Sequence, residues 1–299
     1  MLLPLEAVPN FSEGRDAAVV RAIGRALAER AELLDVHTDP DHNRSVFTLV
    51  AGDREVVDAL LAGIACARDR IDLRGHAGVH PRIGAADVVP IVPVRPGDAE
   101  RARAAARELA RRVGSELGLP VFLYADVGEG RGPAFFRRGG TDELQRRIDA
   151  GELAPDFGPD RLDPAAGGVI VGARRPLIAF NVNLAGANLE AAQAIARVVR
   201  ERDGGFPGVR ALGLDLPSTG QAQVSMNVED WEAAALHEIV ATIEREAAAR
   251  GVDVAGAELV GLMPAGAAAA AAGAILRIDG FDVSRLLELR LLGNAETPR

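Results

Sequence analysis

The strongest constraint on the fold is a repeated alternation of short apolar runs with amphipathic stretches of helical period. Residues 3–8 form an apolar run, and residues 16–30 then carry apolar side chains at helical spacing. This order continues to residue 124, and a second set of the same kind begins at residue 169. Two halves of similar order predict two related units, in each of which helices pack on a sheet.

The individual elements follow from period and turn signals. The first half is expected to hold strands at residues 3–8, 32–37, 45–51, 87–94 and 121–124, and helices at residues 16–30, 54–68, 98–117 and 141–150, the last with Thr141 as its N-cap. The second half is expected to hold strands at residues 169–171, 177–183, 209–215, 222–228 and 257–262, and helices at residues 189–202, 230–250 and 266–273. Turn-forming sequences between successive strands, as at residues 39–43, argue against a purely parallel sheet.

The segment between the two halves is rich in turn-forming residues. Residues 151–168 are dominated by Gly, Pro and Asp, which is typical of a connection between units. We therefore predict one unit over residues 1–167 and another over residues 168–299.

Charge and cysteine content narrow the class of protein. The formal net charge of −9 argues against nucleic-acid binding, although a local basic pocket for a small anion remains compatible with it. Cys66 is the single cysteine, so an internal disulfide and a cysteine metal cluster are excluded. The first residues lack the pattern of a signal peptide, and no apolar stretch reaches the length of a membrane helix. We expect a cytoplasmic protein that does not bind membranes.

Residues 8–16 (VPNFSEGRD) are the first candidate site segment, because they follow an expected strand and open an expected helix. Asn10 and Ser12 are its candidate substrate-binding residues, and the backbone amides at the helix start suit an anionic group. The alternative is a capping loop, with Ser12 or Glu13 serving the helix.

Two further segments hold four of the five histidines. Residues 35–44 contain His37 and His42, and residues 74–90 contain His76 and His80. Histidine changes charge near neutral pH, so two such clusters in polar loops indicate a shared site for proton transfer.

Metal binding is the competing interpretation of these histidines. His76 and His80 have the spacing of a helical zinc pair, but Gly75, Gly78 and Pro81 interrupt any helix there. His37 and His42 with their neighbouring aspartates remain an alternative cation site. We expect no metal.

Several long motifs resemble the formiminotransferase domain of glutamate formiminotransferases, in the single-domain bacterial form. They are VPNFSEGRD, LLDVHTDPDHNRSVFTLVAG, HAGVHPRIGAADVVPIVPV, LPVFLY, APDFGP, VGARRPLIAFNVNL, QAQVSMNV and ELVGLMP, in that order over residues 4–264. The resemblance implies an α+β fold of two subdomains, each a mixed sheet with helices packed on one face, in a ferredoxin-like duplication. It also implies a homodimer.

The resemblance implies a function as well. The family transfers the formimino group of N-formimino-L-glutamate to nitrogen 5 of tetrahydrofolate, in histidine degradation, and tetrahydrofolate is then a co-substrate. Relatives in animals are fused to a cyclodeaminase, which here would be a separate enzyme. Alternatives are a related folate-dependent transferase with another donor such as N-formylglutamate, a folate-binding protein without turnover, and a metal-dependent amidohydrolase.

The family pattern assigns roles to individual residues. The acid–base histidine precedes the proline of the H-P-R motif, which makes it His80, with His37 or Asp35 orienting it. Arg82 is included with His80 and His37 as catalytic. Arg44 and Arg82 are the candidates for binding substrate carboxylates, the alternative being structural ion pairs with nearby aspartates. The folate loop corresponds to Gly158, Pro159, Asp160, Arg161, Leu162, Asp163, Pro164, Ala165, Ala166 and Gly167.

Two positions depart from the animal fusion enzymes. The animal enzymes carry an acidic residue at the position of His37 and a glutamate at the position of Val79, beside His80. We interpret both differences as the mark of a subtype.

Overall fold

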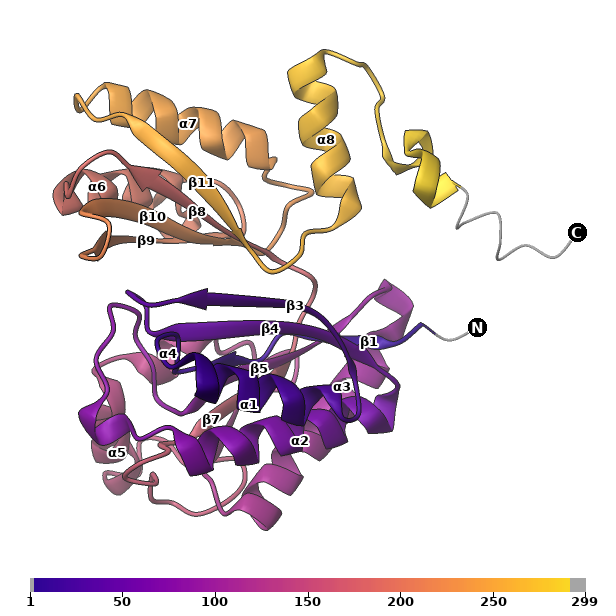
Figure 1. The fold of residues 1–299 in the computed structure, drawn as a ribbon, viewed down its shortest axis with the longest axis vertical. Helices are drawn as coiled ribbons and strands as arrows, with labels where there is room; N and C mark the ends of the chain where they lie inside the picture. Colours follow the sequence, from indigo (N-terminus) through magenta and orange to yellow (C-terminus); the bar gives the residue numbers. More distant parts are fainter. Residues whose placement is uncertain (1–2, 291–299) are drawn as a thin grey trace, which may run out of the picture. The chain divides into compact units, whose positions relative to one another are not determined.

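The computed structural model describes residues 3–290, and the chain divides into two compact units at Arg175/Pro176 (Figure 1). The division lies after strand β7 (Val169–Ala173), whereas the sequence had placed it between residues 167 and 168. The reason is that β7 pairs in parallel with β5 (Ala86–Pro93) and β6 (Val121–Ala125), so it belongs to the first sheet.

The first unit is built on a seven-stranded mixed sheet. Its remaining strands are β1 (Leu5–Ala7), β2 (Asn10–Phe11), β3 (Glu32–Asp39) and β4 (Arg44–Ala51), and its helices are α1 (Ala17–Ala28), α2 (Asp53–Arg70), α3 (Ala99–Arg112), α4 (Pro133–Arg137) and α5 (Gly140–Asp149). The strands β3, β4, β1 with β2, and β5 lie side by side and antiparallel, and β7 and β6 extend the sheet in parallel beyond β5.

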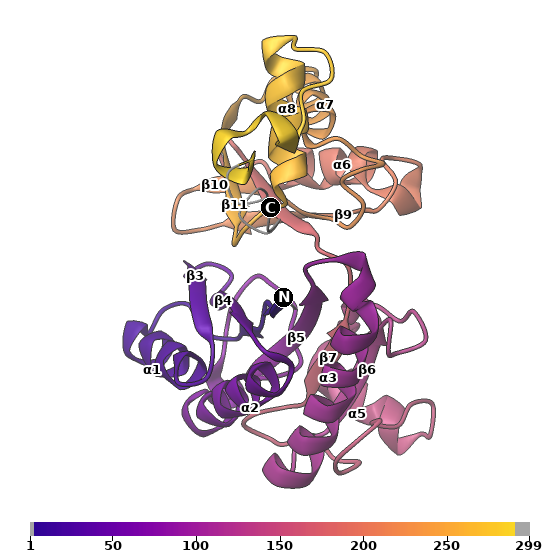
Figure 2. The ribbon, with the colours of Figure 1, turned by 90° about the vertical axis from the view of Figure 1, so that its right-hand side faces the viewer.

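Helices cover both faces of this first sheet. Helices α1, α2 and α3 lie along one face (Figure 2). Their apolar sides are buried against this face, where Phe11, Phe47 and Leu49 are fully buried. Helices α4 and α5 cover part of the opposite face through Phe136 and Leu144. The predicted packing of helices on a single face is therefore wrong for this unit, because side chains alternate across a strand and β5, β6 and β7 are apolar on both sides.

The second unit repeats the strand and helix order of the first. It runs β8 (Ile178–Leu184), α6 (Leu189–Val199), β9 (Val209–Leu216), β10 (Gln221–Val228), α7 (Leu236–Ala248) and β11 (Val254–Val260), followed by α8 (Ala265–Leu276). The sheet order is β11, β8, β10, β9, and all three pairings are antiparallel. This is the ferredoxin-like arrangement, and the predicted duplication is confirmed, although this sheet is antiparallel rather than mixed.

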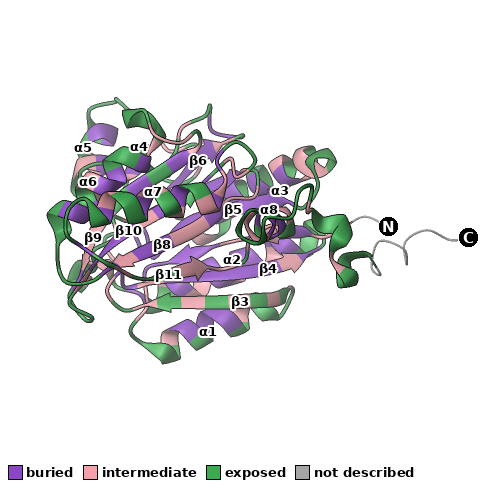
Figure 3. Cartoon of the chain, turned by 90° about the horizontal axis from the view of Figure 1, so that it is seen from above, coloured by how far each residue is buried: buried purple, intermediate pink, exposed green. Residues whose placement is uncertain are grey.

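Local differences from the sequence prediction concern short elements. Helix α4 lies in a segment for which the sequence predicted no helix or strand. Helix α5 begins at Gly140, after Gly139 with φ of +76°, so Thr141 is not its N-cap. Figure 3 shows the alternation of buried and exposed residues that fixes the helix faces, for example on α1.

Candidate active site

The three polar segments singled out in the sequence lie next to one another in the first unit. Ser12 N donates to Ala85 O over 2.8 Å, and Val79 N donates to Asp41 O over 3.1 Å. Asn43 joins all three, because its Oδ1 accepts from Gly14 N at 3.0 Å and its Nδ2 donates to Ala77 O at 3.1 Å. The expectation that the two histidine loops meet is therefore confirmed.

The first segment is tied to the histidine loop rather than to the helix that it opens. Ser12 is 2% exposed, and its Oγ donates to Gly84 O over 2.7 Å. The N-cap of α1 is Asp16, whose carboxylate accepts from Ala18 N and Val19 N. The amides that were expected to receive an anionic group are thus partnered by Asp16, and Ser12 does not cap the helix.

His80 lies half-buried against a guanidinium. Its Nδ1 is 2.8 Å from Pro81 O, and Arg44 Nη1 is 2.6 Å from Nδ1 and 2.7 Å from Nε2. Since Pro81 O can only accept, we assign the proton to Nδ1, which leaves the lone pair of Nε2 facing Arg44. The backbone therefore orients the ring as a neutral imidazole with a basic Nε2.

Electrostatics keep this imidazole neutral. Burial is the largest cause that holds the pKa of His80 well below its usual 6.5, and the charges of Arg44 and Arg137 lower it further. Burial also lowers the pKa of Arg44 to about 9, aided by the charge of Arg137 and opposed by Asp87. A neutral base next to buried cations is suited to accept a proton once an anion has neutralised those cations.

Arg44 is held in place by Asn10. Its Nε donates to Asn10 Oδ1 at 2.9 Å, its Nη2 makes a second bond to the same oxygen, and Asn10 Nδ2 donates to Val8 O at 2.7 Å. The sequence-predicted residues Asn10, Arg44 and His80 therefore form one connected group.

Arg82 contacts mainly backbone. Its guanidinium donates to His80 O at 2.6 Å, His42 O at 2.9 Å and Asn43 O at 3.2 Å, and its Nη1 is 2.7 Å from His76 Nδ1. It thus joins the two histidine loops, and the ion pair with a loop aspartate that was weighed for Arg82 is replaced by carbonyl contacts.

The other three histidines of the two loops have different neighbours. The rings of His42 and His80 have centroids 5.8 Å apart, and His42 Nε2 is 3.8 Å from Asp39 Oδ2. His76 Nε2 is 2.7 Å from Ser12 O. His37 lies on β3 opposite Val46, which in turn lies opposite Asn10, so His37 shares a row and a sheet face with Asn10.

Two charged residues of the cluster were missed in the sequence. Asp87 is 2% exposed at the start of β5, and its Oδ2 accepts from Arg137 Nη2 of α4 at 2.5 Å. An aspartate inside an otherwise apolar strand was a usable signal, since buried carboxylates are paired. No sequence signal pointed to Arg137, because a short helix in a Gly- and Arg-rich segment shows no helical period.

The expected folate loop has two parts. Residues 158–161 are exposed, whereas residues 165–168 are bound to the H-P-R segment through Ala85 N to Ala166 O at 2.8 Å and Gly168 N to Ile83 O at 3.0 Å. A tight turn closes the loop, because Asp163 Oδ1 accepts from Ala165 N and Ala166 N. The loop therefore leads from the surface to the vicinity of His80.

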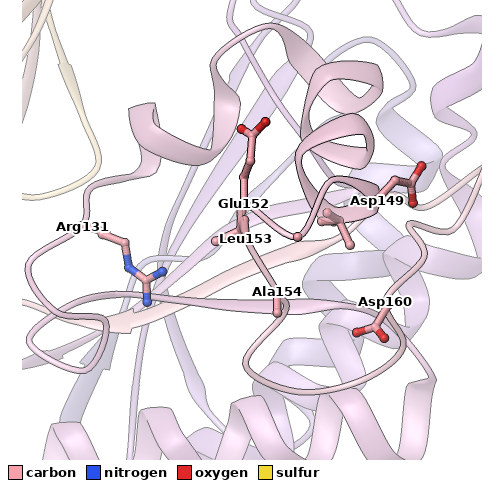
Figure 4. A pocket seen from close by; sticks show the side chains of 8 residues that line it. Arg131, Asp149, Glu152, Leu153, Ala154 and Asp160 are labelled. Atoms are coloured by element: carbon pink, nitrogen blue, oxygen red, sulfur yellow. The ribbon is translucent and has the colours of Figure 1, made fainter.

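An open pocket of about 520 Å³ lies at the exposed end of this loop (Figure 4). Its lining includes Asp149, Glu152 and Asp160 against a single guanidinium, that of Arg131. This excess of negative charge repels carboxylates, so the pocket does not suit the glutamate part of either expected substrate.

Within residues 3–290, no group of three His, Cys, Asp or Glu side chains is placed to hold a metal ion. In the same residues no helix is long and apolar enough to cross a membrane.

The geometry defines a class of protein: an α+β duplication in which a histidine with a lowered pKa lies among arginines. The comparisons with known proteins identify the family. Residues 4–174 match the N-terminal subdomain of the formiminotransferase domain, and residues 179–284 match the formiminotransferase domain. The chain belongs to the formiminotransferase family, and the resemblance read from its motifs is confirmed.

Curated relatives match over nearly the whole chain. A glutamate formimidoyltransferase of Streptococcus pyogenes serotype M1 is 38% identical, covering 97% of this chain and 99% of its own length. One of Thermoplasma acidophilum is 40% identical, covering 96% and 97%. A formimidoyltransferase-cyclodeaminase of Sus scrofa is 40% identical over 87% of this chain but only 50% of its own length.

Proposed function

We propose that this protein is a glutamate formimidoyltransferase, which transfers the formimino group from N-formimino-L-glutamate to nitrogen 5 of tetrahydrofolate. The observation that carries the proposal is the neutral, backbone-oriented His80 beside Arg44. Family membership and the names of its full-length relatives support the same activity.

The chemistry requires one proton to move between two nitrogens. Nitrogen 5 of tetrahydrofolate attacks the formimino carbon, and the bond between them forms as the C=N electrons move to the imino nitrogen. Collapse of the tetrahedral intermediate restores C=N and breaks the bond from carbon to the glutamate nitrogen. His80 Nε2 takes the proton from nitrogen 5 and returns it to the leaving nitrogen, which is worth roughly 10²–10⁴-fold in rate.

Substrate carboxylates make His80 a stronger base. Arg44 is the cation nearest to Nε2, at 2.7 Å, and its charge lowers the pKa of His80. A carboxylate that binds Arg44 neutralises this charge, so the pKa of His80 rises when the donor is bound. Arg82 contributes by holding the His80 carbonyl, and His37 lies one strand farther out on the same face as Asn10.

The finer assignments belong to the same proposal. Tetrahydrofolate is a co-substrate that lies along the loop from Gly158 to Gly167, and no metal takes part. We place the protein in the cytoplasm as a homodimer, with a separate cyclodeaminase consuming its product in histidine degradation. Sedimentation of the purified protein at two concentrations tests the dimer, and a monomer at both would overturn it.

The test is a turnover assay with two donors. Purified protein is mixed with tetrahydrofolate and either N-formimino-L-glutamate or N-formyl-L-glutamate, and product formation is followed by absorbance. The proposal requires turnover with the formimino donor at a kcat/KM well above that with the formyl donor. A reversed preference would assign the site to a formyl transferase instead.

A further inference from the structure

Helix α4 holds its last residue, Arg137, in a fixed position on the sheet. Phe136 is fully buried, with its ring centroid 5.3 Å from that of Phe122 on β6. Arg147 of α5 donates to Phe135 O over 2.8 Å and so satisfies a carbonyl of this short helix. The backbone that carries Arg137 is therefore anchored by packing and by a charged hydrogen bond.

Asp87 orients the Arg137 side chain toward the histidine site. The two side chains are 4% and 12% exposed, and Asp87 Oδ2 lies 2.5 Å from Arg137 Nη2. The other carboxylate oxygen, Oδ1, accepts from Ile83 N at 2.8 Å, directly after the H-P-R motif. Arg137 is thus linked through one carboxylate to the backbone that carries His80.

The cluster holds more positive than negative charge. The charge of Arg137 lowers the pKa values of Arg44, Arg82 and His80. The carboxylate of Asp87 raises the pKa values of Arg44 and Arg82. Arg82 donates to backbone carbonyls and Arg44 donates to Asn10, whereas among residues 3–290 the side chain of Arg137 is bonded to Asp87. Buried like charges are costly unless an anion joins them.

We propose that Arg137 binds one carboxylate of the donor, with Asp87 as the residue that positions it. This inference rests on the proposed function and deepens it. A planar guanidinium oriented on one edge by Asp87 presents its remaining N–H groups for bidentate binding of a carboxylate. Arg44 and Arg137 together then hold both carboxylates of a glutamyl donor, which fixes its formimino carbon relative to His80.

The experiment uses substrates in which single carboxylates are replaced. Wild type, Arg137→Ala and Arg137→Lys are assayed with formiminoglutamate and with its α-carboxamide and γ-carboxamide analogues. Arg138→Ala is the matched control, because it removes the same charge from an exposed neighbouring residue.

The expected result is a selective loss. Arg137→Ala lowers kcat/KM for formiminoglutamate by roughly 10- to 100-fold, yet changes kcat/KM for one of the two carboxamides by less than about threefold. Arg137→Lys recovers part of the loss, because lysine keeps the positive charge but cannot bind a carboxylate through two parallel N–H groups. Arg138→Ala behaves as wild type. An equal loss on all three donors would show a structural role and overturn the proposal.

A binding measurement separates this inference from the proposed function. Calorimetric titration with glutarate, a plain dicarboxylate, needs no turnover, so it applies even if formiminoglutamate proves to be the wrong donor. If glutarate binds Arg137→Lys more weakly than wild type, the result supports a carboxylate site at Arg137. Equal affinity for glutarate would overturn it, whatever the turnover assay shows.

Discussion

Replacing Arg82 tests whether it joins the histidine loops or acts on substrate. In Arg82→Met, the carbonyls of His42, Asn43 and His80 lose a charged donor. Three such bonds would be worth ~1.5–3 kcal/mol each in isolation, but water reaches the half-buried site, so we expect a loss of about 2–4 kcal/mol in the free energy of unfolding. Arg82→Lys should recover less than half of this, because an ammonium group cannot reach three carbonyls lying in different directions.

Urea denaturation provides the assay, with a residue-specific signal for each unit. Tyr124 is the single tyrosine and lies in the first unit, whereas Trp231 is the single tryptophan and lies in the second. The midpoint read from Tyr124 should fall in Arg82→Met. Arg74→Met is the control on the same loop, since Arg74 pairs with Asp72 at the surface, and its midpoint should not change. A change below about 0.5 kcal/mol in Arg82→Met, together with lost turnover, would refute the structural role.

The remaining predictions concern protonation and close packing. Arg44→Gln should raise the pKa of His80 toward 6.5, because a charge that disfavours imidazolium is removed; an NMR titration in which the His80 shift stays unmoved would contradict this. Because the folded-state pKa of His80 is below its unfolded value, the free energy of unfolding should fall as pH drops below 6.5, and less steeply in His80→Gln. Ser12→Ala should cost about 1–2 kcal/mol of stability through the lost bond to Gly84 O, with KM unchanged, whereas a raised KM would point to substrate contact. Gly167→Ala should destabilise by more than about 2 kcal/mol in urea denaturation, because φ is +70° and the new Cβ would lie 2.0 Å from a backbone oxygen; near-wild-type stability would contradict the loop geometry.

The sequence predicted the fold wherever a period was long enough to identify an element. The apolar spacing of α2 and the apolar run of β4 were sufficient for both. Helix α4 is five residues long, which is too short for a helical period to show. Its two adjacent phenylalanines are equally compatible with a loop. The boundary between units was misplaced because a turn-rich segment looks the same whether it joins two units or two strands of one sheet.

The sequence predicted which residues make up much of the candidate site, but it predicted fewer of the contacts between them. His80, Arg44 and Asn10 were singled out and are in contact, since motifs and residue chemistry point to them directly. The Asp87–Arg137 pair joins residues 50 positions apart and depends on how α4 packs on the sheet. Which arginine donates to carbonyls and which presents its guanidinium to a ligand is a property of tertiary structure, so no residue pattern distinguishes them.

The central claim is that His80 carries the proton between the two nitrogens. The most direct measurement is single turnover of formiminoglutamate with tetrahydrofolate by wild type and His80→Ala, without and with added imidazole. The account predicts a rate lower by roughly 10²–10⁴-fold in the variant, unchanged tetrahydrofolate affinity, and partial recovery with imidazole that follows its neutral form. A variant that turns over at the wild-type rate would contradict the account.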